Sequence, residues 1–167
     1  MTVINVNTVQ SIYKLVYVAY YMSSNFIDNI MKNRDFFLTP LRKDILTVIL
    51  DNKGGMKAYD ILTAISSIRG ETKAITVYRV LNFLVRKRVL HKIISKNIFI
   101  LCSSTDDEHK DNSVFLVCKN CNSTNEIHDT RFLSNLNKFY THYNFALGQD
   151  TVELGGYCTK CHVSAIE

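Results

Sequence analysis

The chain has 167 residues, of which 47% are hydrophobic, and its 20 Lys and Arg exceed its 15 Asp and Glu by a net charge of +5. This length suits one domain or two small ones, and this apolar fraction is that of a folded globular protein. The sequence has no run of about 18 apolar residues, the length that a membrane-spanning helix requires. Residues 12–22 come nearest, but they lack the features of a secretory signal. We therefore expect a cytoplasmic protein.

The charge is divided unevenly along the chain. Residues 1–101 contain 15 Lys and Arg against 6 Asp and Glu, a net charge of +9, whereas residues 102–167 contain 5 against 9, a net charge of −4. A basic half beside an acidic half suggests that the basic part faces a polyanion such as nucleic acid. A lysine-rich solvated surface would give the same totals, so charge alone leaves both interpretations open.

The first clear helix of the sequence is expected to begin at Thr39 and Pro40. Thr39 is a good N-cap, and Pro40 stands where a missing N–H costs nothing. Apolar residues then recur at helical spacing, at Leu41, Ile45, Val48 and Ile49. Gly54 and Gly55 are expected to end this helix.

Two further helices and a hairpin are predicted next. Residues 56–68 and 73–88 show helical periodicity, and residues 89–101 alternate around a turn at 95–97, as in a β-hairpin. The apolar stripes of the two helices are expected at Ile61, Leu62 and Ile65, and at Val77, Val80, Leu81 and Leu84. Three short helices followed by a hairpin give the order of a winged helix-turn-helix domain, in which the last helix lies in the DNA major groove.

Polar residues near the start of this last helix are candidates for DNA contact. Lys73, Thr76, Tyr78 and Arg79 lie off the apolar stripe, where they would reach phosphates and base edges. Arg79 is the candidate for guanine O6 and N7. The alternative is that Tyr78 packs between helices and Arg79 is merely solvated. The net charge of this half favours nucleic-acid binding.

The acidic half is predicted to form a compact α/β module. Strands are expected at 114–117 and 151–154, a helix at 130–143, and a further segment at 124–129. A module of about 60 residues is near the size below which a hydrophobic core needs additional support.

Two Cys-x-x-Cys pairs in this half carry the most specific signal of the sequence. They are Cys118 with Cys121 and Cys158 with Cys161, with 36 residues between the pairs. Two such pairs offer four thiolates from two tight turns, the donor set of a structural zinc site. Cytosolic thiols are kept reduced, so paired cysteines there more often hold metal than form disulfides. A catalytic dithiol or a haem attachment at residues 158–162 would each leave the other pair unexplained.

Four further residues stand around the junction of the two halves: His91, Cys102, His109 and Glu126. Each has an ordinary explanation when it is taken alone: a surface histidine, a small buried thiol, a loop histidine and a solvated carboxylate. Taken together, they make a second tetrahedral site with N, S and O ligands plausible.

Several short motifs, in order along the chain, carry a resemblance to a known family. They are "LTPLR", "AYDIL", "TVYRVLNFL", "HK", "NIFILC", "FLVCKNC", a Glu five residues after Cys121, and "ELGGYCTKC", and they span residues 38–161. Together they resemble the ferric uptake regulator family, and most closely its zinc-sensing branch. The resemblance implies a homodimeric transcriptional repressor, not an enzyme, that binds palindromic operator DNA when loaded with zinc and controls zinc-uptake genes.

The resemblance also implies domain boundaries and residue roles. A winged-helix DNA-binding domain would occupy residues 1–101, a hinge 102–112, and a dimerisation and zinc-binding domain 113–167. Structural zinc would be held by Cys118, Cys121, Cys158 and Cys161, and regulatory zinc by His91, Cys102, His109 and Glu126. Tyr59, Tyr78 and Arg79 match the DNA-contacting positions of the family. Two zinc ions per subunit are expected.

The soft thiolate of Cys102 favours zinc over Fe(II) or Mn(II), which prefer nitrogen and oxygen ligands. An iron- or peroxide-sensing regulator of the same family remains the nearest alternative. Thiol redox proteins and zinc-ribbon RNA-binding modules are alternatives of other classes.

The sequence departs from the family in two places. A histidine-rich string is reduced to His109 alone, which leaves His128 as a substitute ligand because residues 126 and 128 of a strand share a face. In addition, 37 residues precede the "LTP" motif. Residues 1–21 are expected to be either an untranslated stretch before a start at Met22 or a helical extension that packs on the DNA-binding domain.

Overall fold

The computed structural model of the chain describes residues 27, 36–52, 55–103, 113–121, 123–127, 129–146 and 151–162. Its elements, in chain order, are α2 (Pro40–Asp51), α3 (Ala58–Arg69), α4 (Ala74–Arg86), β1 (Leu90–Ile93), β2 (Ile98–Leu101), β3 (Val114–Cys118), β4 (Thr124–Ile127), α5 (Thr130–His142), β5 (Val152–Gly156) and α6 (Thr159–His162). The expectations for residues 1–21, Met22, His109 and His128 lie outside the described residues. None of the described helices is both long and apolar enough to cross a membrane.

The helical unit follows the predicted pattern closely. Thr39 caps α2 by accepting a hydrogen bond from the backbone N–H of Arg42 at 3.4 Å, and Pro40 is the first helical residue. The helix α4 ends two residues earlier than predicted, and Arg88 follows it with a left-handed φ of 55°. The predicted stripe residue Val80 is only partly buried. The core of this unit contains Ile45, Leu46, Ile49, Ile61, Ile65, Val77, Leu81, Leu84 and Leu90.

The hairpin β1–β2 is attached to the helical unit through β2. Its strands pair antiparallel, with Leu90 opposite Leu101 and Ile93 opposite Ile98, as the alternation predicted. Met56 and Phe99 exchange two backbone hydrogen bonds, of 3.0 and 2.7 Å, and thereby join the α2–α3 connection to β2. Gly55 permits this approach because it has a φ of 79° and because a Cβ there would lie 2.4 Å from Ile100.

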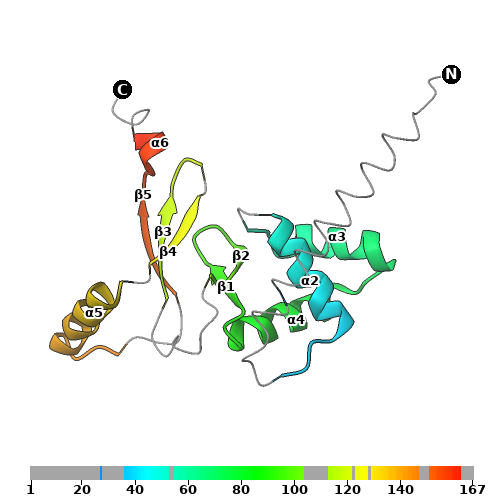
Figure 1. Cartoon of the computed structure of the whole chain (residues 1–167), viewed down its shortest axis with the longest axis horizontal. Helices are drawn as coiled ribbons and strands as arrows, with labels where there is room; N and C mark the ends of the chain where they lie inside the picture. Colours follow the sequence, from blue (N-terminus) through cyan, green and yellow to red (C-terminus); the bar gives the residue numbers. More distant parts are fainter. Residues whose placement is uncertain are drawn as a thin grey trace.

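The C-terminal unit is a three-stranded sheet in the order β4–β3–β5. The strands β3 and β4 are antiparallel and β3 and β5 are parallel. The helix α5, capped by Asp129, contains no buried residue, and it lies on the opposite side of the sheet from the helical unit (Figure 1). Helices and sheet together agree with the expected winged helix-turn-helix unit followed by an α/β unit.

The hairpin also packs against the C-terminal sheet. A second apolar cluster combines Ile93, Ile98 and Ile100 of the hairpin with Phe115 and Val117 of β3. In Figure 1 the hairpin lies between the helical unit and the strands β3–β5. The same short element therefore contacts both units of the molecule.

Candidate functional site

Four cysteine sulfurs gather at one end of the C-terminal sheet. Cys118 ends β3, Cys121 follows in a turn, Cys158 follows β5, and Cys161 lies in α6. The four Sγ atoms all lie within 4.8 Å of one another. Sγ of Cys121 and Sγ of Cys158 are 3.6 Å apart, so the cluster joins one Cys-x-x-Cys pair to the other.

The strand topology explains why these pairs meet although they are far apart in sequence. The strands β3 and β5 run parallel, and Cys118 stands opposite Gly156 in their register. Each Cys-x-x-Cys pair therefore begins at the carboxyl end of its strand, and parallel strands place these ends at the same edge. A backbone hydrogen bond from Lys119 to Gly156, 2.8 Å long, continues the pairing into the first turn.

The chemistry of the four thiols suits a divalent cation. Backbone N–H groups of Cys121 and Cys158 lower the pKa of Cys118 to about 6, and the hydroxyl of Ser123 lowers the pKa of Cys121. Hydrogen bonds to Cys158 and Cys121 keep the proton on Cys161 and raise its pKa to about 12. Four thiolates cannot share so small a volume without a balancing positive charge, and four sulfurs in this arrangement are the ligands that zinc prefers.

A second group of metal-ligand side chains lies between the hairpin and the C-terminal sheet. His91 is on β1, Cys102 directly follows β2, and Glu126 is on β4. One ligand atom of each lies within 4.8 Å of those of the other two, and Nε2 of His91 is 3.4 Å from Oε1 of Glu126. The structure thus brings together three of the four residues of the expected second site. The fourth, His109, and its substitute His128 lie outside the described residues.

The side chains of this second group are buried, which the ordinary explanations assume for Cys102 but not for His91 and Glu126. The side chains of His91 and Glu126 are only 8% and 6% exposed, and Cys102 is 1% exposed. The ring of His91 packs against Phe115, with ring centroids 5.0 Å apart. His91 is therefore no surface residue of the hairpin, and Glu126 is not a fully solvated carboxylate.

Ser103 orients the carboxylate of this group. Its hydroxyl donates to Oε2 of Glu126 at 2.7 Å, and its backbone N–H lies 3.3 Å from the same atom. Burial would raise the pKa of Glu126, but the charge of His91 and the hydrogen bonds from Ser103 outweigh burial and hold the pKa below its ordinary value. An ionised carboxylate, an imidazole and a thiol in one buried group form a donor set that fits zinc. Apart from its position next to Cys102, no sequence signal points to Ser103.

The side chains expected to contact DNA are exposed on α3 and α4. Tyr59 and Tyr78 are 73% and 46% exposed, so Tyr78 does not pack between helices as the alternative required. Lys73, which is the N-cap of α4, and Thr76 and Arg79 on its first turns are also exposed. All five side chains are free of the helical core.

Two more arginines lie beside Arg79. Arg42, Arg79 and Arg86 line a hollow of about 390 Å³ along α4. The guanidinium of Arg42 stacks on the ring of Phe83 at 3.7 Å and donates to the backbone carbonyl of Phe37 at 2.6 Å, which fixes its direction. Sequence reasoning missed Arg42 and Arg86, although Arg42 belongs to the "LTPLR" motif. Three arginines on one face provide the positive surface that phosphates require.

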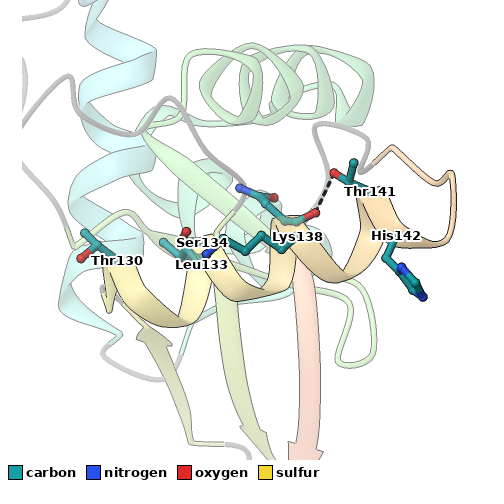
Figure 2. Close-up of a pocket in the computed structure, with 7 residues that line it drawn as sticks. Thr130, Leu133, Ser134, Lys138, Thr141 and His142 are labelled. Carbon is teal, nitrogen blue, oxygen red and sulfur yellow. Dashed lines mark hydrogen bonds between the residues drawn. The ribbon is translucent and has the colours of Figure 1, made fainter.

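A second hollow, with a volume of about 670 Å³, lies along the side of α5 (Figure 2). Its lining is mostly neutral and polar: Thr130, Leu133, Ser134, Asn137, Lys138, Thr141 and His142. Thr141 bonds to the backbone carbonyl of Asn137 at 2.9 Å, so its hydroxyl serves the helix itself. None of the predicted site residues within the described part of the chain lines this hollow.

Comparison with known proteins gives one consistent family. The model of the ferric uptake regulator family matches residues 33–155. The zinc uptake regulation proteins of Escherichia coli (strain K12) and Shigella flexneri are each 28% identical over 134 residues, which are 80% of this chain and 78% of theirs.

Solved structures agree with these relatives. A zinc uptake regulator complexed with zinc and DNA has a TM-score of 0.73 at 26% identity, over 89% of this chain and 98% of the other. The holo form of a protein named XcZur has a TM-score of 0.70 at 30% identity, over 83% and 96% of the two chains.

Proposed function

Because the chain belongs to the ferric uptake regulator family, we propose that it is a zinc-responsive transcriptional repressor that binds palindromic operator DNA as a dimer and controls zinc-uptake genes. The observation that carries this proposal is the buried group His91, Cys102 and Glu126, which contains ligands from both the hairpin and the C-terminal sheet. The curated relatives are zinc uptake regulation proteins, and one similar structure contains zinc and DNA. The same family consists of transcription regulators, which agrees with a protein that is not an enzyme.

We assign the two metal clusters different tasks. The four cysteines, all within the C-terminal unit, are the structural site, and His91, Cys102 and Glu126 form the regulatory site, completed by His109. This gives two zinc ions per subunit. Zinc in the regulatory site would cross-link the hairpin to β4, and a ligand that prefers one arrangement of two units shifts the population toward it. The presence of the soft Cys102 thiolate favours zinc over iron as the sensed metal.

The DNA-binding surface that we propose is the exposed face of α4 together with Tyr59. Lys73, Thr76, Tyr78 and Arg79 would contact the major groove, with Arg79 on a guanine edge. Arg42 and Arg86 add positive charge on the same side and suit backbone phosphates. This assignment makes residues 1–101 the DNA-binding domain and residues 102–112 the hinge.

Residues 113–167 would form the dimerisation domain. A single chain leaves several large apolar side chains exposed on this unit, and a second copy would cover them. They are Leu116 and Leu154 on the sheet, Phe132 and Phe139 on α5, and Tyr143 and Phe145 after it. Exposed apolar groups on one unit are typical of protein–protein contact sites.

DNA binding measured against buffered free zinc tests the proposed function. The probe is a palindromic duplex selected from a random library with zinc-loaded protein, and a scrambled duplex is the control. We expect binding of the selected duplex to rise with free zinc as the metal content approaches two ions per subunit. Equal binding of both duplexes, or binding that is indifferent to zinc, would contradict the proposal.

Fe(II) titration of DNA binding and mild oxidation of the protein separate the alternatives. An iron-sensing regulator of the family would respond to Fe(II) at concentrations where zinc occupies only the four-cysteine site. A thiol redox protein would lose its zinc and gain a disulfide within a Cys-x-x-Cys pair upon mild oxidation, with thiol exchange activity that DNA does not affect.

A further inference from the structure

One row of residues across the C-terminal sheet carries two carboxylates. Phe115 of β3 stands opposite Glu126 of β4 and also opposite Glu153 of β5. Residues directly opposite each other in a sheet point to the same face. The two glutamates therefore flank one buried ring on the face of the sheet that contacts the hairpin. Glu126 belongs to the proposed regulatory site, but Glu153 has no part in either metal cluster.

Glu153 binds the turn of the hairpin directly. Its Oε1 accepts a hydrogen bond from the backbone N–H of Ile94 at 2.5 Å, and its Oε2 accepts one from the N–H of Ser95 at 3.1 Å. Two residues before Glu153, just ahead of β5, the hydroxyl of Thr151 donates to the backbone carbonyl of Lys92 at 3.3 Å. Hydrogen bonds to an ionised carboxylate are roughly twice as strong as neutral ones. These three bonds join β5 and the residue before it to residues 92–95, which are the end of β1 and the start of the hairpin turn.

The hairpin is thus held at both ends of the row. At one end His91 and Cys102 face Glu126, and at the other Ile94 and Ser95 donate to Glu153. Between them, Phe115 packs against His91 and the isoleucines of the hairpin. The contact at Glu153 needs no metal, because it consists of a carboxylate and two amides of the chain itself.

We propose that Glu153 is a positioning residue that holds the hairpin turn on β5 in the metal-free protein and thereby raises the zinc affinity of the site formed by His91, Cys102 and Glu126. This inference depends on the proposed function in one respect: it takes the group His91, Cys102 and Glu126 as the regulatory site. The apparent dissociation constant of a site equals its intrinsic value divided by the fraction of molecules in the binding-competent arrangement. By holding the hairpin in place, Glu153 increases that fraction. It therefore tunes the zinc concentration to which the protein responds without touching the metal.

The first measurement is metal binding by the full-length protein with zinc retained in the four-cysteine site. Co²⁺ is titrated into the other site, and absorption from the Cys102 thiolate reports its binding. We expect Glu153→Ala to weaken Co²⁺ binding about tenfold, since its loss removes two charge-assisted hydrogen bonds. Glu153→Gln keeps one strong acceptor and should recover part of the affinity. The control is Glu71→Ala, which removes an exposed carboxylate from the loop before α4 and should leave affinity unchanged.

The second measurement needs no added metal at the regulatory site. Amide hydrogen exchange followed by NMR reports the N–H groups of Ile94 and Ser95 individually. In the unmutated protein these two amides should exchange slowly, and in Glu153→Ala they should exchange at least about tenfold faster. The paired amides of β1 and β2 should change little, because those strands bond to each other. Such a pattern distinguishes release of the turn from unfolding of the hairpin.

The two readouts separate failure of this inference from failure of the proposed function. If Glu153→Ala leaves both the Co²⁺ affinity and the exchange of Ile94 and Ser95 unchanged, Glu153 does not position the hairpin. The same conclusion follows if Glu71→Ala weakens Co²⁺ binding equally. If the unmutated protein binds no Co²⁺ at Cys102, the proposed regulatory site is wrong, and the link from Glu153 to metal affinity is overturned with it. Retention of one zinc per subunit confirms that each variant keeps the four-cysteine site.

Discussion

The two metal-ligand clusters of this molecule are built from similar residues but from different parts of the fold. All four cysteines of the first cluster lie at or directly after the ends of two hydrogen-bonded strands, in the turn that follows β3 and in the short helix α6 that follows β5. The second cluster takes His91 from the hairpin, Cys102 from the end of the hairpin, and Glu126 from the C-terminal sheet. The first lies within one unit, whereas the second bridges two.

This difference determines what a bound ion can do at each place. An ion held within one unit stabilises the fold of that unit, because the folded strands bring its ligands together. An ion held between two units stabilises their arrangement, and it can change that arrangement only if it binds one form better than the other. The types of the ligand residues alone do not distinguish a structural site from a regulatory one. The helices and strands on which the ligands lie do distinguish them.

The largest expected effect is that of Cys118→Ser. It removes one of four ligands from the cluster that supports a small C-terminal unit, so we expect loss of about one zinc per subunit and loss of cooperative unfolding and dimerisation. Metal analysis, circular dichroism and sedimentation measure these three properties. Asn120→Ser, in the same turn but with no ligand atom, is the matched control and should behave as the unmutated protein. A folded dimer with full zinc content would show that the first cluster is not structural.

Cys102→Ser should separate the two clusters most clearly. We expect a folded dimer that keeps the zinc of the four-cysteine site, loses the second zinc, and no longer changes its DNA affinity with free zinc. Thermal unfolding should stay close to that of the unmutated protein, since the thiol and the hydroxyl have similar volumes. Aggregation together with loss of zinc from the four cysteines would instead reverse the roles that we assign to the clusters.

Arg79→Ala tests whether DNA contact can be lost while both clusters remain intact. We expect DNA binding to weaken by about 1 to 3 kcal/mol and base specificity to relax, with the content of two zinc ions unchanged. Fluorescence anisotropy with the selected and scrambled duplexes measures both effects. Arg69→Ala, which removes an exposed arginine that pairs with Asp44, is the control of equal charge. If both substitutions weaken binding equally, α4 does not read the base sequence.

Ser103→Ala should give the smallest effect. The substitution removes the 2.7 Å hydrogen bond to Glu126 but no ligand of the second cluster. Groups that orient a ligand typically contribute about tenfold or more to metal affinity. We therefore expect zinc binding at the second cluster to weaken about tenfold and zinc binding at the four-cysteine cluster to stay unchanged. Competition with a zinc chelator of known affinity measures it. Unchanged affinity would mean that β4 alone fixes the carboxylate.

Much of the fold could be predicted because its signals are local. The cap Thr39, the helical stripes and the alternation of the hairpin are read from neighbouring residues, and the helices and strands that were predicted begin and end within about two residues of the prediction. The short helix α6 was not predicted. Cys118, Cys121, Cys158 and Cys161 were also visible, since spacing within each pair is itself a local pattern. Their meeting at one sheet edge confirms the expected four-cysteine cluster.

The contacts between the two units could not be predicted in this way. Nothing around Glu153 distinguishes it from a solvated strand residue until β5 is paired with β3 and the hairpin is laid across the sheet. The burial of His91 likewise depends on Phe115, which is 24 residues away in the sequence. These features arise from tertiary packing, so periodicity and motif spacing carry no information about them.

The pairing of Met56 with Phe99 gives the hairpin a mechanical role. At the second residue of β2, close to the turn, the hairpin is joined by two backbone hydrogen bonds to the connection that leads into α3, and the turn itself donates hydrogen bonds to Glu153 of β5. Because both contacts belong to the same pair of strands, a displacement of the sheet would act on the residues that lead into α3. This contact depends on Gly55, because a Cβ at that position would lie 2.4 Å from Ile100 and would prevent the close approach of the two segments.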